Sequence, residues 1–147
     1  MAVFTGGCHC GNLRVRFDAT RPPGELGARD CGCGFCQRHG ARYASDPAGS
    51  LDVTVADQDR LIRYRFGHRV ADFLVCAVCG VFVCAVTAHD GGIRAVLNIN
   101  ALDSAGAFPA EATAMDYDGE GEDDRTSRWA ARWTPATLSA TMSPGPS

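Results

Sequence analysis

Eight cysteines in a chain of 147 residues constrain this sequence more than any other feature. Cysteines two residues apart are too close to form a comfortable disulfide with each other. The opening MAVFTGG has neither a charged segment nor a long apolar run, so we expect no export signal and a cytoplasmic location. In a reducing compartment, clustered thiols typically bind metal or take part in catalysis. The groups are Cys8 with Cys10, Cys31 with Cys33 and Cys36, and Cys76 with Cys79, while Cys84 stands apart.

Length and composition indicate one ordinary folded domain, which we expect over residues 4–135, followed by a disordered tail at 139–147. Contents of 46% hydrophobic and 21% charged residues are typical of a soluble globule. The formal net charge is −3 with no basic run, so nothing in the composition indicates a nucleic-acid partner. No apolar run approaches the roughly 20 residues that a membrane-spanning helix needs. We therefore expect neither a nucleic-acid nor a membrane partner.

Alternating apolar and polar residues predict a mainly β protein. Leu13, Val15 and Phe17 alternate with charged residues, as in a strand with one buried face. The C-x-x-C pair followed by Gly80 lies between two apolar runs, which predicts a hairpin whose turn carries two thiols. The expected strands cover residues 13–17, 51–55, 61–66, 71–76, 81–87 and 93–99.

The remaining segments predict a long loop and weak helices. Gly and Pro are frequent in residues 20–50, so we expect a loop there, with a helical turn after Cys36. Helix candidates are residues 102–107 and 123–133. The second contains both tryptophans of the chain, one turn apart, and we expect them to pack in the core.

Two cysteine groups have the form of metal-binding turns. The C-x-x-C-G sequence at 76–80 aims both sulfurs to one side of a hairpin turn, and the C-H-C-G sequence at 8–11 also ends in glycine. Four thiolates in a tetrahedron make a closed structural zinc site. An alternative pairs the cysteines of 31–36 with the 76–79 turn. The favoured structural ligands are Cys8, Cys10, Cys76 and Cys79.

The C-G-C-G-F-C run is then left with three sulfurs. Three protein ligands and an open fourth position distinguish a catalytic zinc site from a structural one. His39 and Cys84 are candidates for a fourth ligand, although Cys84 alternates within an apolar strand and is expected to be a buried small hydrophobe. Arg29, Arg38 and Arg42 flank the run and are candidates for contact with an anionic substrate. The predicted ligands of this second zinc are Cys31, Cys33 and Cys36.

The ordered cysteine groups resemble a known family. GG-C-H-C-G, then C-x-C-x-x-C, then YRFG, then C-x-x-CG, and finally MDYDGEGEDDR at 115–125 are similar to the glutathione-dependent formaldehyde-activating enzyme family. The resemblance covers residues 4–135. It implies a β-tent fold of small antiparallel sheets joined through a structural zinc, related to a Rab-binding chaperone and to centromere protein V. Carried onto this chain, it implies the same division into a structural quartet and a second, catalytic zinc site.

The resemblance also implies a reaction, the addition of glutathione to formaldehyde to give S-hydroxymethylglutathione, classed as a carbon–sulfur lyase reaction. The substrates would be a small-molecule thiol and an aldehyde, with two zinc ions per chain as cofactors. Zinc held by three thiolates is a good dock for another soft ligand such as a substrate thiol. His39 is the nearest titratable candidate to give the alkoxide its proton. The alternatives are a non-catalytic zinc scaffold of the same fold that binds a protein or small ligand, or a zinc enzyme of another class.

Overall fold

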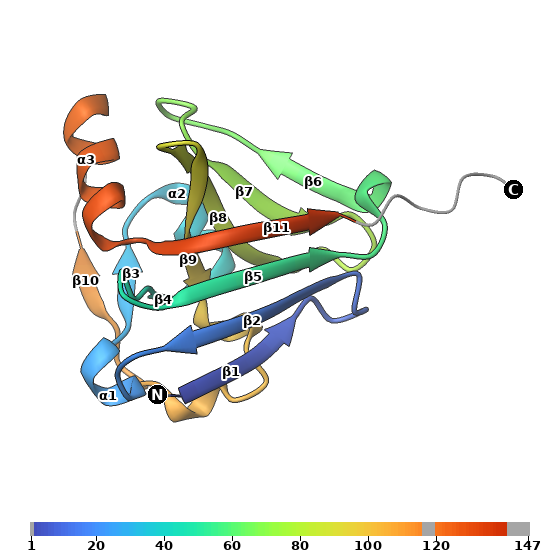
Figure 1. The fold of residues 1–147 in the computed structure, drawn as a ribbon, viewed down its shortest axis with the longest axis horizontal. Helices are drawn as coiled ribbons and strands as arrows, with labels where there is room; N and C mark the ends of the chain where they lie inside the picture. The colour runs from blue at the N-terminus through green and yellow to red at the C-terminus, as the bar shows by residue number, and fades with distance from the viewer. Residues whose placement is uncertain (1, 116–119, 141–147) are drawn as a thin grey trace, which may run out of the picture.

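The computed structural model describes residues 2–115 and 120–140, which form a mainly β protein with short helices (Figure 1). The mainly β prediction is confirmed. The helices are α1 (Pro23–Leu26), α2 (Gly34–His39) and α3 (Glu122–Arg132), with 3-10 turns η1 (Gln58–Arg60), η2 (Ile99–Ala101) and η3 (Ala105–Ala107). The strands are β1 (Ala2–Gly7), β2 (Leu13–Ala19), β3 (Arg29–Cys31), β4 (Tyr43–Ala44), β5 (Ser50–Val55), β6 (Leu61–Tyr64), β7 (Asp72–Cys76), β8 (Phe82–His89), β9 (Gly92–Asn98), β10 (Thr113–Met115) and β11 (Thr134–Ala140).

Strand β9 is the branch point of the sheet. One edge of β9 pairs with β8, and the sheet continues through β7 to β6. The other edge is divided, because residues 93–95 pair with β11 and residues 97–98 pair with β4. From β11 the sheet continues through β5 and β2 to β1, and from β4 through β3 to β10. Figure 1 shows β1, β2, β5 and β11 as one layer in front of β8 and β9.

This connected sheet differs in two ways from the separate antiparallel sheets that the resemblance implies. The strands belong to one hydrogen-bonded network, and two of the pairings, β11 with β5 and β10 with β3, are parallel. Strands β10 and β11 are rich in small residues and lack a strong apolar alternation, so the sequence pattern did not predict them.

Alternation along the strands decides which side chains enter the core. In β2 and β5 every second residue is buried, as the sequence predicts, whereas the central strand β8 is buried on both faces from Phe82 to Val86. The buried residues form two hydrophobic clusters. The larger contains Cys8 and Cys76, and the smaller contains Cys36. Cysteines of different groups therefore belong to different parts of the core.

The 20–50 segment contains more regular structure than the predicted loop, namely α1, β3, α2 and β4. Helix α2 begins at Gly34 rather than after Cys36, because the Cys33 side chain accepts a hydrogen bond from the Cys36 N–H at 3.4 Å and caps the helix. The predicted helix at 123–133 is confirmed as α3, with acidic residues in its first turn. Of the turn expected at 102–107, η3 covers residues 105–107.

The expected boundaries at the C-terminal end need correction. Strand β11 continues through Ser139 and Ala140, which pair with Thr54 and Val55 of β5. The ordered part of the domain therefore extends past residue 135, because these residues complete a parallel pairing with β5. The rest of the predicted tail, residues 141–147, lies outside the described residues.

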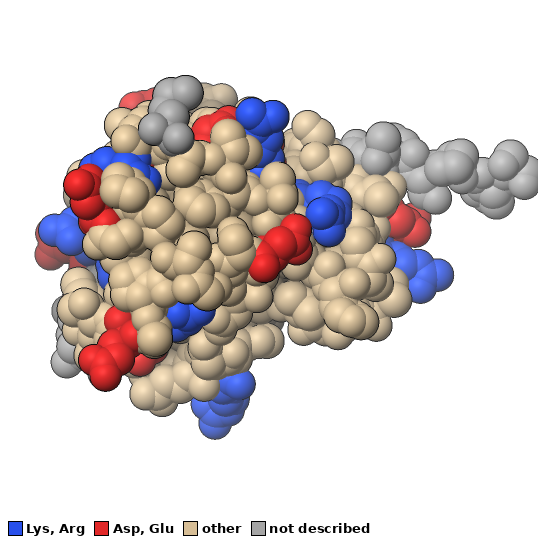
Figure 2. Space-filling view, turned by 90° about the horizontal axis from the view of Figure 1, so that it is seen from below, with Lys and Arg blue, Asp and Glu red and all other residues tan. Residues whose placement is uncertain are grey.

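Charged side chains are interspersed on the face shown in Figure 2, where Arg residues and acidic residues alternate over a mostly uncharged surface. Among the described residues of this face no continuous basic surface is present. Within residues 2–115 and 120–140, none of the helices has the length and apolar character needed to cross a membrane.

Candidate metal centres and the adjoining cavity

A four-sulfur cluster lies where the β1–β2 and β7–β8 hairpins meet. The Sγ atoms of Cys8 and Cys10 are 3.7 Å apart, and those of Cys10 and Cys76 are 3.5 Å apart. Zn–S bonds of about 2.3 Å in a tetrahedron separate the sulfurs by about 3.8 Å, so this spacing fits a zinc ion. The cluster pairs the two turns that the sequence analysis favours, not the 76–79 turn with 31–36. Its members, all within 4.8 Å of one another, are Cys8, Cys10, Cys76 and Cys79.

Backbone geometry aims these sulfurs at a common point. Cys8 Sγ accepts a backbone N–H at 3.2 Å, and Cys76 Sγ accepts one at 3.4 Å. Gly11 and Gly80, which follow the second cysteine of each turn, have φ values of +90° and +80°, a region that favours glycine. These backbone contacts fix the orientation of the two side chains in the cluster.

A three-sulfur cluster lies within one short segment. Cys31 ends β3, Cys33 caps α2, and Cys36 lies inside α2, with their Sγ atoms within 4.8 Å of one another. Among the His, Cys, Asp and Glu side chains of residues 2–115 and 120–140, none adds a fourth ligand atom to this group. The Tyr43 hydroxyl lies 2.8 Å from Cys36 Sγ. The donor set therefore fits a metal ion with three protein ligands and one open position.

Contacts within the three-sulfur cluster shift the acidities of its members. Hydrogen bonds from Cys31 and Cys36 lower the pKa of Cys33 to about 2. The contact with Cys33 raises the pKa of Cys31, and the contacts with Cys31 and Cys33 raise that of Cys36. Burial and the neighbouring Cys36 raise the pKa of Tyr43. Tyr43 therefore stays protonated and donates its hydrogen bond to Cys36 when that sulfur is a thiolate.

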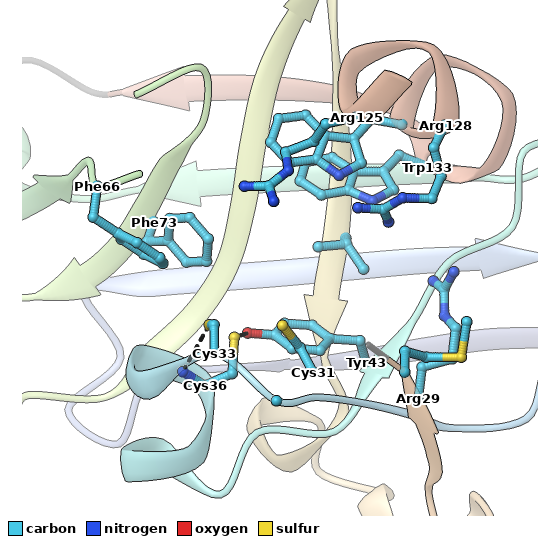
Figure 3. Close-up of a pocket in the computed structure, with 14 residues that line it drawn as sticks. Arg29, Cys31, Cys33, Cys36, Tyr43, Phe66, Phe73, Arg125, Arg128 and Trp133 are labelled. Carbon is cyan, nitrogen blue, oxygen red and sulfur yellow. Dashed lines mark hydrogen bonds between the residues drawn. The ribbon is translucent and has the colours of Figure 1, made fainter. Parts of the chain in front are cut away.

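The three-sulfur cluster forms one wall of a cavity of 120 Å³. Figure 3 shows the three sulfurs and Tyr43 on one side of this space, with the guanidinium groups of Arg125 and Arg128 reaching toward it from α3 on the other side. Arg29 also lines the cavity. The apolar part of the lining consists of Phe66, Phe73, Val96, Met115, Trp129 and Trp133.

Glu120 holds the two arginines of α3 in place. Its carboxylate accepts two hydrogen bonds from Arg128, at 3.0 and 2.9 Å, and one from Arg125 at 3.2 Å. These bonds, those from Arg128 first, lower the pKa of Glu120. The three side chains are only 17–23% exposed, so this network is partly buried beside the cavity.

Comparison with known proteins decides the family. The sequence model described as glutathione-dependent formaldehyde-activating enzyme matches residues 3–116, which include every cysteine of both clusters. The chain belongs to this family. A crystal structure of a Rhodobacter sphaeroides protein is similar, with a TM-score of 0.58 and 28% identity over 76% of this chain and 99% of that chain. Helix α3 lies beyond the part that the family model matches.

Three residues that the sequence analysis considered for the second site have side chains that do not line the cavity. The His39 ring packs on Phe35, with ring centroids 4.5 Å apart. Arg38 donates to a backbone carbonyl of its own helix at 3.0 Å, and Arg42 donates to the Asn100 side chain at 3.1 Å. None of the three is among the described residues that line the cavity. The geometry therefore gives no support to His39 as proton donor or to Arg38 and Arg42 as substrate contacts.

Cys84 is a core residue, as the sequence predicts. It is fully buried in β8, belongs to the larger hydrophobic cluster, and lies outside both sulfur clusters. Burial raises the pKa of its thiol to about 12. A buried, protonated thiol of this kind is chemically inert at neutral pH.

Sequence reasoning missed the contribution of α3 to the site. Trp129 and Trp133 are buried, with stacked rings 4.4 Å apart, as expected for core residues, but they also line the cavity. The available signal was the spacing of Arg125, Arg128 and Trp129, which places all three on one side of a helix. The role of Tyr43 had no such local signal, because its hydroxyl meets Cys36 only after the chain folds.

Proposed function

We propose that this protein is a zinc-dependent enzyme that adds a thiol to formaldehyde or another small aldehyde at the three-sulfur cluster. The observation that carries the proposal is a set of three sulfurs that lines a cavity, with no fourth ligand atom from the described His, Cys, Asp and Glu side chains. Membership of the formaldehyde-activating family supports the same class of reaction. The four-sulfur cluster would hold a second zinc with a structural role.

The reaction balances without a further reactant. The thiol gives its proton to water, its sulfur forms a bond to the carbonyl carbon, and the carbonyl π electrons move to oxygen, which takes a proton back from water. Zinc bound by Cys31, Cys33 and Cys36 would offer its open position to the substrate sulfur and favour the thiolate form. The product is a hydroxymethyl thioether.

The residues around the cluster support this chemistry by positioning and by excluding water. The Tyr43 hydroxyl hydrogen-bonds Cys36 and so fixes the orientation of that sulfur. The apolar walls, among them Phe66 and Phe73, limit the water that competes with a thiol for the open position. With His39 away from the cavity, water is the proton source for the alkoxide.

The proposal is tested by following the consumption of formaldehyde and a thiol by proton NMR, with glutathione as the first thiol. Because thiols also add to formaldehyde without a catalyst, each rate is compared with the rate without protein. We expect the zinc-loaded protein to exceed this background and Cys33→Ser to return to it while remaining folded. A wild-type rate equal to the background for several thiols would contradict the proposal and favour a non-catalytic zinc scaffold.

A further inference from the structure

Two indole N–H groups in the wall of the cavity have no hydrogen-bond partner. Trp129 and Trp133 both line the cavity and are only 7% and 5% exposed, so each residue is more than nine-tenths buried. Within residues 2–115 and 120–140, neither indole N–H takes part in a hydrogen bond. The N–H of a buried tryptophan usually finds an acceptor, because an unpaired buried donor costs free energy. Two unpaired donors in one wall therefore point to an acceptor that a ligand supplies.

The two donors are open to the cavity. Among the described residues, no buried side-chain nitrogen or oxygen is sealed off without a hydrogen-bond partner, so both indole nitrogens keep contact with open space. The cavity is the open space that both residues line. Figure 3 shows Trp133 across this space from the three sulfurs, with its ring nitrogen on the side that faces them. The rings of Trp129 and Trp133 are stacked 4.4 Å apart, so each holds the other in place in this wall.

The other polar side chains of the lining already have partners. These side chains are three arginines and Tyr43, and each of them takes part in a hydrogen bond. The partners are Glu120 for Arg125 and Arg128, Ser45 for Arg29, and Cys36 for Tyr43. The indole N–H groups differ from all of these because they are unpaired, so they are available to a ligand without breaking an existing contact.

The proposed reaction produces an acceptor in this space. When a thiol sulfur at the three-sulfur cluster adds to formaldehyde, the carbonyl oxygen lies on the carbon bonded to that sulfur and becomes an alkoxide. The cavity volume is 120 Å³, somewhat smaller than the roughly 150 Å³ of an apolar cavity that holds benzene, so this oxygen lies close to the walls. Negative charge that develops beside apolar side chains requires hydrogen-bond donors that are placed in advance.

We propose that the indole N–H groups of Trp129 and Trp133 bind the carbonyl oxygen of the aldehyde and stabilise the alkoxide formed from it. This inference rests on the proposed function, which supplies the thiol and the aldehyde. An indole N–H only donates a hydrogen bond, so both indoles keep their protons and the alkoxide takes its proton from water. Both tryptophans lie beyond the part of the chain that the family model matches, so the donors come from outside the matched region.

The indole N–H groups can be observed directly by NMR. The chain has two tryptophans, so the ¹H–¹⁵N spectrum of the zinc-loaded protein should contain two indole peaks. The probes are 2-mercaptoethanol and 1-propanethiol, which have equal numbers of heavy atoms, although only the first carries an oxygen. We expect 2-mercaptoethanol to move the indole protons downfield and to slow their exchange with water, and 1-propanethiol to do neither. Equal effects of the two thiols, as when only water binds the indoles, overturn the inference.

Replacement of each tryptophan tests the effect on the reaction. Trp129→Phe and Trp133→Phe keep an aromatic wall but remove one N–H. A hydrogen bond to a charged oxygen is strong enough that we expect kcat for addition of glutathione to formaldehyde to fall roughly tenfold to a hundredfold in each variant. The affinity for 1-propanethiol, followed by the fluorescence of the remaining tryptophan, should change much less because this ligand has no acceptor. A wild-type kcat in both variants overturns the inference.

A control and the NMR measurement cover damage to the fold. Tyr64→Phe removes the hydroxyl of a ring that is 47% exposed and not among the described residues lining the cavity, and it should behave like the wild type. If a tryptophan variant fails to fold, the spectra of the wild-type protein decide the inference, because they need no substitution.

The possible outcomes separate this inference from the proposed function. A wild-type rate above the background, with equal effects of the two thiols on the indole peaks, overturns the inference alone. A wild-type rate at the background, with indole peaks that neither thiol moves, overturns the proposed function and this inference with it.

Discussion

The two sulfur clusters of this molecule place the same side chain in different surroundings. The four-sulfur cluster joins two hairpins that are distant in the sequence, with its sulfurs spaced as a tetrahedral zinc requires. The three-sulfur cluster comes from a single segment and lines a cavity with Tyr43 and the arginines of α3. In the proposed function, the first would tie the fold together, and the second would give a ligand access to an open position on its metal.

The difference follows from where each cluster gets its ligands. A metal bridging two distant hairpins stabilises the fold, because the unfolded chain has no preformed site and the binding free energy becomes folding free energy. A metal held within residues 31–36 would close only a short loop, so we expect its removal to leave the long-range pairing of the sheet intact. The predictions below test this division, from the largest expected effect to the smallest.

Loss of the four-sulfur site should prevent stable folding. Cys10 is exposed, so Cys10→Ser removes a metal ligand with little change in core packing. Structural zinc contributes roughly 10–16 kcal/mol in small zinc domains, comparable to the total stability of about 5–15 kcal/mol of a typical domain. Far-UV circular dichroism and thermal unfolding should show an unfolded or severely destabilised protein. A Cys10→Ser protein with the wild-type melting temperature would contradict the structural role.

The matched substitution in the other cluster should abolish activity and preserve the fold. Cys33→Ser is expected to remove one of two zinc equivalents and to return thiol addition to its background rate, with a melting temperature within a few degrees of wild type. Metal analysis, circular dichroism and the NMR rate measure these three quantities on one sample. If Cys33→Ser unfolds the protein, the three-sulfur cluster is structural and the comparison between the two clusters fails.

Removing the Tyr43 hydroxyl should affect only the three-sulfur site. Loss of an outer hydrogen bond to a metal ligand typically costs 10–100-fold in metal affinity, so Tyr43→Phe should weaken zinc binding there by roughly that factor. Competition with a chromogenic chelator should show one weakened and one unchanged zinc. Tyr64→Phe is the control, since Tyr64 is 47% exposed and is not among the residues lining the cavity. Equal affinities in the two variants would show that the hydroxyl has no role at the metal site.

The smallest effect is expected at the cysteine that belongs to neither cluster. Cys84→Ala removes a buried sulfur from β8 and should cost about 1 kcal/mol of stability, as typical point substitutions do. The zinc content should remain at two, and the rate of thiol addition should not change. A lost zinc equivalent in Cys84→Ala would make Cys84 a ligand and overturn its assignment to the core.

Local patterns in the sequence were sufficient to predict much of this molecule. Alternation identified β2 and β5, because a strand with one buried face needs apolar residues at every second position. Runs of apolar residues between turn signals identified the strands around β7, β8 and β9. The two cysteine turns ending in Gly11 and Gly80 predicted the four-sulfur cluster, because the spacing of ligands on a tight turn decides where the sulfurs point. Because those two turns already supply four sulfurs, the three cysteines of residues 31–36 were predicted to form a separate group.

Only the tertiary structure decided which side chains surround the three-sulfur cluster. Proximity in the sequence favoured His39, Arg38 and Arg42, yet helix α2 and its turn direct these side chains to other partners. The cavity instead receives Arg125 and Arg128 from α3, a helix far along the chain. Such contacts depend on how β9 divides its edge between β4 and β11, since that branching sets where α2 and α3 lie. A pattern within a few residues carries no information about a pairing of this range, so the two groups of sulfurs could be predicted and the walls of the cavity could not.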